Sequence, residues 1–316
     1  MRRAAEHGTR AEALVTREPR LWAVVGATGT GKSALSLDLA ERLAAAGRPA
    51  EIVNADAMQL YRGMDIGTAK LPVAERRGIP HHLFDALEPG EEAAVAWYQP
   101  VAREAVEGIR ARGADAILVG GSGLYVSSVV YDFAFPPRDD ALRVSLEAEL
   151  AEGGVDPLLA RLKSLAPETA EAVDTRNPRR VVRALEVAML GGDARVTLPE
   201  EPALWCAETR IVGVHCERAT LVERLDRRVE QMWADGLLDE VRGLIPNGLE
   251  QGRTASRAIG YAQALAELRG DATRAQAVAE TQALTRRYAR RQVSWFKRYP
   301  DISWVDGPAA GALDLA

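Results

Sequence analysis

The sequence predicts an α/β protein: a P-loop (phosphate-binding loop) core with a mostly parallel sheet flanked by helices, plus a helical insertion domain. Short apolar, β-rich runs alternate along the chain with segments of helical spacing, an order typical of βαβ units. The first run, residues 21–26, enters a glycine-rich turn, and apolar residues at helical spacing follow over 32–43. Four further β-rich runs lie at residues 51–56, 82–84, 116–119 and 210–215.

A break in this alternation marks the insertion. Pro136 and Pro137 interrupt the pattern, and short helical segments follow to about Ala172. Further along, residues 220–244 are predicted to form one helix with a buried apolar stripe. The N-terminal residues mix charged side chains with Gly and Ala and show no apolar period, which favours a disordered leader. We therefore expect three parts: a leader at 1–19, a P-loop core at 20–135 and 175–316, and a helical insertion at 136–174.

The composition argues against several classes of protein. A chain of 316 residues that is 47% hydrophobic can bury a full core. It contains neither the apolar run of roughly 18 to 20 residues that a membrane span needs nor a signal peptide, so we expect a cytoplasmic protein with no membrane partner. We also expect a monomer. The cysteines, Cys206 and Cys216, are too few for a disulfide scaffold and lack the spacing of a zinc site.

The strongest motif is GATGTGKS, which matches the phosphate-loop pattern G-x-x-x-x-G-K-[ST] between a predicted strand and a predicted helix. Its glycines let backbone N–H groups close around phosphate oxygens, and the helix N-terminus adds its dipole. Lys32 contributes a positive charge, and the hydroxyl of Ser33 can ligate Mg²⁺. The motif recognises phosphates whether or not they belong to a nucleotide, so an NTPase or a kinase stays open here. The expected diphosphate ligands are Gly26, Ala27, Thr28, Gly29, Thr30, Gly31, Lys32 and Ser33.

Two further motifs follow the ends of predicted strands. Asp56 comes at the carboxyl end of the second strand, where α/β sheets build their sites, and is a candidate general base. GGSGLY, residues 120–125, has glycines that permit close backbone approach to a ligand, and Ser122 offers a hydroxyl. Taken singly, Asp56 could be a Mg²⁺-associated carboxylate or a helix cap, and Ser122 a turn hydroxyl. Together with the phosphate loop, both motifs predict one crevice.

A basic surface is predicted near the C-terminus although the net charge of the chain is −5. A helical projection of residues 284–299 gives one stripe that we expect to pack inward, consisting of Leu284, Tyr288, Trp295 and Tyr299. The opposite side carries basic charges alone, because no Asp or Glu occurs between residues 285 and 300. Most charge runs are simply solvated, but such a face can also contact nucleic-acid phosphates. Its members are Arg286, Arg287, Arg290, Arg291, Lys297 and Arg298.

Seven blocks in order resemble the tRNA dimethylallyltransferase family, also called isopentenyl-diphosphate:tRNA transferases, in the shorter bacterial form. The resemblance spans roughly residues 21–300, and seven ordered blocks are too many for a chance match. Besides the phosphate loop, the blocks are DAMQLYRGMDIGTAK at 56–70, PHHLFD at 80–85, GGSGLY at 120–125, NPRRVVRALEV at 177–187, SRAIGYAQ at 256–263 and RRYARRQVSWFKR at 286–298.

This resemblance implies a reaction and its participants. The phosphate loop would hold the diphosphate of dimethylallyl diphosphate together with Mg²⁺, and the acceptor would be the exocyclic amine of the adenine immediately 3′ of the tRNA anticodon. ATP is then not the substrate. The catalytic aspartate of the family falls on Asp56, its adenine-contacting glutamine on Gln59, and its hydroxyl near the bridging oxygen of the diphosphate on Ser122. Lys32 and an arginine of the 179–183 block, taken as Arg183, would stabilise the leaving group.

The resemblance also implies a tRNA surface, and it shows two departures. The family usually has serine after the catalytic aspartate, where this chain has Ala57, and threonine in the glycine-rich block, where this chain has Ser122. The second change keeps the hydroxyl, and we expect activity to survive the first. The expected contacts with the anticodon stem-loop are Asp56, Ala57, Met58, Gln59, Arg179, Arg180, Val181, Val182, Arg183, Arg257, Gly260, Tyr261, Arg290, Arg291, Trp295 and Lys297.

Three other functions fit part of this pattern. An adenylate dimethylallyltransferase acting on free AMP or ADP would share the phosphate loop and Asp56, but the basic helix and the helical insertion favour a polymeric acceptor. A P-loop kinase for a small metabolite predicts ATP turnover without a prenyl donor. A nucleotide-gated RNA-binding module would use Asp56 for Mg²⁺ alone and would catalyse no transfer.

Overall fold

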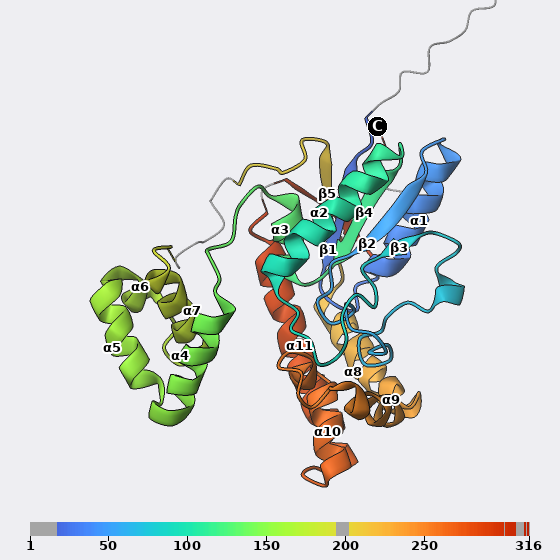
Figure 1. Cartoon of the computed structure of the whole chain (residues 1–316). Helices are drawn as coiled ribbons and strands as arrows, with labels where there is room; N and C mark the ends of the chain where they lie inside the picture. Colours follow the sequence, from blue (N-terminus) through green and yellow to red (C-terminus); the bar gives the residue numbers. More distant parts are fainter. Residues whose placement is uncertain (1–17, 194–201, 300, 308–312, 314, 316) are drawn as a thin grey trace, which may run out of the picture. The chain divides into compact units, whose positions relative to one another are not determined.

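A computed structural model of the chain describes residues 18–193, 202–299, 301–307, 313 and 315. It divides into two compact units (Figure 1). The larger unit is formed by the chain up to Val130 and from Cys206 onward, and the smaller unit is Tyr131–Trp205. The expected disordered leader falls almost wholly on residues 1–17, which lie outside the described residues.

The larger unit is built on a six-stranded sheet in which all paired strands are parallel. This confirms the predicted α/β class with a mostly parallel sheet. The edge strand β6 was not predicted, because Val305 is its one buried residue and the strand therefore shows no apolar run. In sheet order the strands are β3 (His81–His82), β2 (Ala50–Asn54), β4 (Asp115–Gly120), β1 (Leu21–Gly26), β5 (Thr209–His215) and β6 (Ile302–Asp306).

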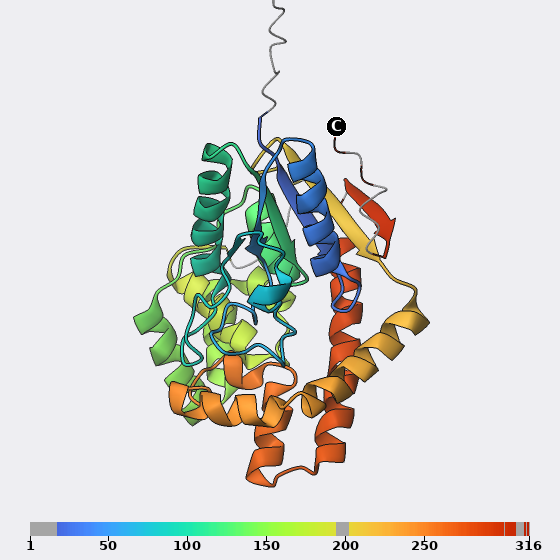
Figure 2. The same cartoon turned by 90° about the vertical axis from the view of Figure 1, so that its right-hand side faces the viewer.

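Helices cover both faces of this sheet. Apolar residues of α1 (Lys32–Ala45) pack with alternate residues of the strands, such as Trp22, Val24 and Ile117. Figure 2 shows α1, in blue, and α2 (Val95–Ala111), in teal, on opposite sides of the sheet. The short helix α3 (Gly123–Val130) contacts α2 and β4. The central strands β1 and β4 are thus buried on both faces, which explains their near-continuous apolar sequences.

Four helices extend beyond the carboxyl ends of the strands (Figure 1). The single helix predicted over 220–244 is wrong, because the chain turns at Gly236, whose φ of +100° is a left-handed value that glycine adopts readily. Three short 3₁₀ turns lie at Val73–Glu75, Ile245–Asn247 and Ala255–Arg257. The four helices are α8 (Arg218–Ala234), α9 (Leu237–Leu244), α10 (Tyr261–Arg269) and α11 (Arg274–Phe296).

The smaller unit is helical and has its own apolar core. It is longer than the insertion expected at 136–174, because α7 packs on α4 and α5 within it. The apolar stripe of α7, which includes Val181 and Leu185, is buried in that core. The helices of this unit are α4 (Asp140–Gly153), α5 (Val155–Leu165), α6 (Pro167–Ala172) and α7 (Pro178–Met189).

Candidate active site

The phosphate loop joins β1 to α1, as its motif predicted. Gly31 precedes the helix with a φ of +100°, which brings the N-terminal N–H groups of α1 to the loop. The carbonyl oxygen of Ala27 accepts hydrogen bonds from two side chains, from Lys32 Nζ at 2.8 Å and from Thr30 Oγ1 at 2.9 Å. The Ser33 side chain is exposed at the start of the helix. The loop therefore offers backbone donors, an ammonium group and an accessible hydroxyl.

Three charged side chains influence one another beside this loop. Burial lowers the pKa of Lys32 to about 8; the Asp56 carboxylate opposes this effect, and the Arg228 charge adds to it. Burial raises the pKa of Asp56, against the effects of the Met58 N–H group and the Lys32 charge. The pKa of Arg228 is also lowered by burial, and its Nη1 lies 3.5 Å from Thr28 Oγ1. Two cations and one carboxylate thus surround the loop, a combination that favours a bound anion.

Arg228 was missed in the sequence. It stands seven residues after the buried Leu221 of α8, so a helical projection already places it on the inward stripe. Its neighbours Arg224 and Arg227 are exposed, whereas Arg228 is half-buried. The sequence did carry a signal for it, namely an arginine on the apolar side of a helix in a protein that has a phosphate loop.

Asp56 is held by a local turn at the end of β2. Its N–H group donates to Asn54 Oδ1 at 2.9 Å, and its Oδ1 accepts the Met58 N–H group at 3.0 Å. Asn54 Nδ2 donates to the carbonyl oxygens of Asp56 at 3.1 Å and Leu83 at 3.0 Å. The carboxylate is therefore fixed by backbone contacts, as a group that must meet a substrate in one orientation needs to be.

Ser122 is brought next to the Asp56 turn, as the sequence predicted for the two motifs. The Ser122 Oγ accepts the N–H group of Ala57 at 3.2 Å and lies 3.4 Å from the Tyr288 hydroxyl. Burial raises the pKa of Tyr288 to about 12, and the nearby Asp56 carboxylate acts in the same direction. The Tyr288 hydroxyl therefore stays protonated near neutral pH, and both it and the Ser122 hydroxyl can donate hydrogen bonds.

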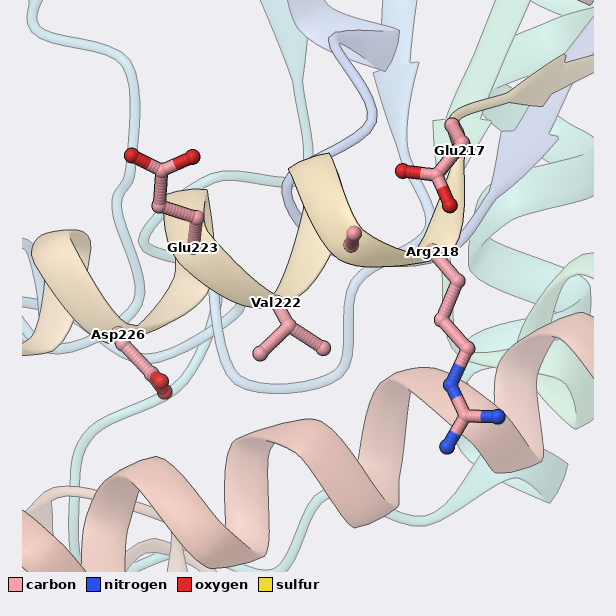
Figure 3. Close-up of a pocket in the computed structure, with 6 residues that line it drawn as sticks. Glu217, Arg218, Val222, Glu223 and Asp226 are labelled. Carbon is pink, nitrogen blue, oxygen red and sulfur yellow. The ribbon is translucent and has the colours of Figure 1, made fainter.

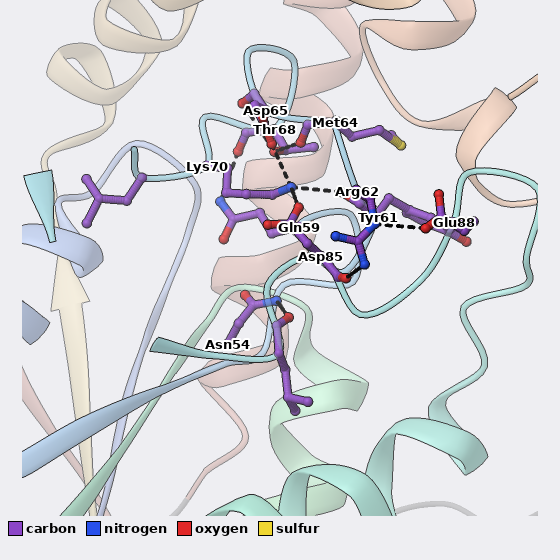
Figure 4. Close-up of polar contacts among 12 residues, drawn as sticks. Asn54, Gln59, Tyr61, Arg62, Met64, Asp65, Thr68, Lys70, Asp85 and Glu88 are labelled. Carbon is purple, nitrogen blue, oxygen red and sulfur yellow. Dashed lines mark hydrogen bonds and ion pairs between the residues drawn. The ribbon is translucent and has the colours of Figure 1, made fainter. Parts of the chain in front are cut away.

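Hydrogen bonds and ion pairs of buried and half-buried side chains hold the loop after Asp56 in place (Figure 4). The Gln59 amide Nε2 donates to the carbonyl oxygen of Thr68 at 3.0 Å, which turns its Oε1 away from that bond. The buried Lys70 Nζ donates to Tyr61 O at 2.7 Å and pairs with Asp65 at 2.7 Å and Asp85 at 2.6 Å. Because a buried ammonium group that loses one partner is strongly destabilising, this cluster holds the loop in a single conformation.

Comparisons with known proteins decide the family. The family model described as IPP transferase matches residues 59–299. The chain belongs to the IPP transferase family. It is 58% identical over 284 residues to a tRNA dimethylallyltransferase of Clavibacter sepedonicus, covering 90% of this chain and 92% of that protein. A tRNA dimethylallyltransferase of Leifsonia xyli subsp. xyli is 64% identical over 250 residues, covering 79% of this chain and 95% of that protein.

Solved structures agree with this assignment. The full-length tRNA isopentenylpyrophosphate transferase from Bacillus halodurans is 37% identical, with a TM-score of 0.64, and covers 92% of this chain and 90% of its own. A eukaryotic dimethylallyltransferase described as acting on tRNA is 26% identical, with a TM-score of 0.76, and covers 91% of this chain and 74% of its own. The IPP transferase fold therefore extends over nearly the whole chain.

Tyr261 of this IPP transferase does not present its side chain at a surface, contrary to the expected tRNA contact. It is fully buried, and its hydroxyl donates to Glu240 Oε1 at 2.5 Å. The Glu240 carboxylate also accepts the N–H groups of Ile66 at 2.7 Å and Asp65 at 3.1 Å. A methyl group on Gly67 would lie 2.4 Å from the Tyr261 ring. Tyr261 and Glu240 therefore position the loop that follows Gln59.

The basic side of α11 is partly as predicted. Arg287, Arg290 and Arg291 are exposed, and so are Lys297 and Arg298. Arg286 is different, because it pairs with Asp226 of α8 and is not part of the free basic face. Its acidic partner comes from a different helix. The prediction considered only the acids between residues 285 and 300, so it could not find this partner.

The inward stripe of α11 is rotated from the predicted one. The buried residues in this part of the helix are Ala289, Gln292 and Phe296, while Leu284 and Tyr288 are only half-buried. Tyr299, which follows the end of the helix, is buried as predicted. Gln292 is a polar residue on this otherwise apolar side of the helix. It can be buried there because both ends of its amide form hydrogen bonds inside the unit. Sequence reasoning missed it, since a lone glutamine in an arginine-rich segment carries no apolar signal.

Other expected tRNA contacts in the larger unit lie in different surroundings. Trp295 is half-buried, with its Nε1 3.2 Å from Ser127 Oγ and the Arg298 guanidinium 5.5 Å from its ring centroid. Arg257 is exposed, whereas Gly260 is buried at the start of α10, where its N–H group donates to Gln263 Oε1. Gly260 therefore serves the helix start.

The arginine block belongs to the smaller unit, so its relation to the phosphate loop stays a prediction. Arg179 and Arg180 are exposed. Val181 and Val182 are buried in the apolar core, which excludes RNA contact through their side chains. The Arg183 guanidinium pairs with the buried Glu186 at 2.9 Å and also donates to the carbonyl oxygens of Pro136 and Pro137. In this structure Arg183 therefore holds the segment at Pro136 and Pro137 against α7.

A surface hollow at the N-terminal end of α8 is not the donor site (Figure 3). It is lined by Glu217, Arg218, Ala219, Val222, Glu223 and Asp226. Three carboxylates against one guanidinium would repel a diphosphate. Among the residues that the structure describes, no cluster of three or more His, Cys, Asp or Glu side chains could hold a metal ion, and no helix is long and apolar enough to cross a membrane.

Proposed function

We propose that this chain is a tRNA dimethylallyltransferase. It transfers a dimethylallyl group from dimethylallyl diphosphate to the exocyclic N6 amine of the adenosine 3′-adjacent to the anticodon and releases diphosphate. The observation that carries the proposal is the meeting of a phosphate loop, the half-buried Asp56 carboxylate and the Ser122 hydroxyl in one site. A kinase can also combine a phosphate loop with a carboxylate base, so the identity of 58% and 64% to tRNA dimethylallyltransferases is what favours prenyl transfer over phosphoryl transfer.

The donor is held by its diphosphate. The N–H groups of residues 26–33 would surround the phosphate oxygens, and Lys32 and Arg228 would neutralise their charge. The exposed Ser33 hydroxyl would hold Mg²⁺, with the diphosphate oxygens and water supplying its other ligands, which suits a cation that keeps several waters. Bound there, Mg²⁺ would offset negative charge on the leaving group.

Asp56 acts on the acceptor. The N6 lone pair forms a bond to the first carbon of the dimethylallyl group, the bond from that carbon to the bridging oxygen breaks, and its electron pair leaves with the diphosphate. The N6 proton passes to Asp56. Burial raises the pKa of this carboxyl group and so makes it a stronger base, while the Lys32 charge helps to keep it ionised.

Charge on the departing diphosphate is stabilised from several directions. Lys32 and Arg228 supply positive charge, and the hydroxyl of Ser122 can donate to the bridging oxygen. Donors that are already oriented stabilise developing charge without reorganisation, so these groups act most strongly as the carbon–oxygen bond breaks.

The RNA would approach along α11. The exposed Arg290, Arg291 and Lys297 can contact backbone phosphates. The target adenine must leave its stack to reach Asp56, at a cost of a few kcal/mol. Because Gln59 donates its amide Nε2 to the Thr68 carbonyl, the Oε1 atom is available to accept from the adenine amine.

The test is a transfer assay with purified protein, an anticodon stem-loop RNA, Mg²⁺ and labelled dimethylallyl diphosphate. Wild type should place label in the RNA, and Asp56→Asn should slow transfer by about 10²- to 10⁴-fold, the usual contribution of a general base. Asp38→Asn is the matched control, because it removes a carboxylate that pairs with Arg77 on the surface. Labelled free AMP in place of labelled RNA, or ATP turnover without a prenyl donor, would contradict the proposal.

A further inference from the structure

Gln292 joins two loops of the active site through one buried amide. Its side chain is 3% exposed. The Oε1 atom accepts the N–H group of Thr28 in the phosphate loop at 2.8 Å, and the Nε2 atom donates to the carbonyl oxygen of Gly121 at 2.8 Å. Because an N–H group and a carbonyl oxygen are the two partners, the orientation of the amide is settled.

The glycine-rich turn is shaped to admit this amide. A methyl group on Gly121 would lie 2.3 Å from Gln292 Nε2, so a side chain there would displace the amide from its place. Thr28 and Gly121 follow β1 and β4, which are neighbours in the sheet. The amide therefore spans the carboxyl ends of two adjacent strands, one leading to the phosphate loop and the other to Ser122.

Two more residues of α11 contact the same loops. Ala289 lies in one apolar cluster with Ala27 of the phosphate loop. Tyr288, one helical turn before Gln292, has its hydroxyl 3.4 Å from Ser122 Oγ. The helix thus meets both loops on one face, and Gln292 is the point at which hydrogen bonds reach both of them.

We propose that Gln292 is a positioning residue for the transfer reaction, an inference that rests on the proposed function. By bonding both loops, it sets the distance between the donors that hold the diphosphate and the Ser122 hydroxyl that serves its bridging oxygen. Loops have soft backbone dihedrals, and a shift of about 1 Å in a catalytic group can slow a reaction by about 10²-fold. A bonded amide in a dry interior resists such a shift because breaking it leaves buried polar groups unsatisfied.

The decisive variant is Gln292→Met, which keeps the length of the side chain and removes both hydrogen bonds. Its readouts are the Kd of Mg²⁺-diphosphate by calorimetry, kcat and KM in the transfer assay, and the thermal midpoint. We expect the Kd and the donor KM to rise together by about 10-fold or more. This is the scale of one charge-assisted hydrogen bond, here the one that a displaced N–H group of the phosphate loop would no longer donate to the diphosphate. Thr281→Val is the control, since Thr281 is a buried polar residue of α11 whose hydroxyl bonds Ala277 of the same helix.

Gln292→Asn is the second variant, for use if the methionine variant does not fold. It keeps a polar amide but is one methylene too short to reach both loops, so we expect the same rise in Kd. A folded variant of either kind with the Kd and kcat/KM of wild type would overturn the inference. So would a fall in thermal midpoint and active fraction with unchanged Kd and donor KM. If wild type itself neither binds diphosphate nor labels RNA, the proposed function fails instead.

Discussion

Lys32 should make the unliganded protein less stable, and Lys32→Met should therefore stabilise it. Burial lowers the pKa of this lysine from 10.5 to about 8. At 1.36 kcal/mol per unit, the shift corresponds to about 3 kcal/mol of unfavourable burial at neutral pH. The side chain keeps some solvent contact, and the Ala27 carbonyl loses a hydrogen bond in the variant, so the net gain should be about 1 to 2 kcal/mol.

The pH dependence of this effect has a definite sign. The unfolded chain binds a proton at Lys32 up to about pH 10.5, and the folded chain does so only up to about pH 8. Between these values the unfolded state binds more protons, so the stability of wild type rises with pH. The advantage of Lys32→Met should therefore shrink by about 1 kcal/mol between pH 7 and pH 9.

Urea unfolding of both proteins at pH 7 and pH 9, followed by circular dichroism, measures this change. The control is Lys163→Met, which removes an exposed lysine from α5 and should differ little from wild type at either pH. The same Lys32→Met protein should be almost inactive in the transfer assay. A variant that is less stable than wild type at pH 7, or an advantage that grows with pH, would refute the burial argument.

Three further outcomes are expected. The kcat/KM of wild type should fall above about pH 8, where Lys32 loses its charge, and Lys32→Arg should lack this alkaline limb even if its rate is low. Arg290→Ala and Arg291→Ala should each weaken RNA binding and reduce the slope of log affinity against log salt by about 1; an unchanged slope would remove them from the interface. Tyr261→Phe should lower the free energy of unfolding by about 1 to 3 kcal/mol and leave RNA affinity unchanged, because its hydroxyl serves Glu240; the reverse result would restore Tyr261 as an RNA contact.

Local chemistry determined the parts of the site that one segment can specify alone. The phosphate loop needs a strand, glycines and a helix start within a few residues, so its pattern was readable in the sequence. Asp56 and Ser122 followed from their places at the carboxyl ends of parallel strands, where a sheet brings its loops together. The parallel sheet itself followed from the alternation of apolar runs and helical segments.

What the sequence could not settle were pairings between segments far apart along the chain. The edge strand β6 forms by pairing with β5. The acid that pairs with Arg286 comes from α8, and the Tyr261 hydroxyl donates its hydrogen bond to Glu240 of α9. Each of these depends on a partner whose identity only packing reveals. Gln292 shows the physical reason most clearly: a buried amide is stable only where a donor and an acceptor both meet it, and the tertiary structure alone brings Thr28 and Gly121 to its two ends.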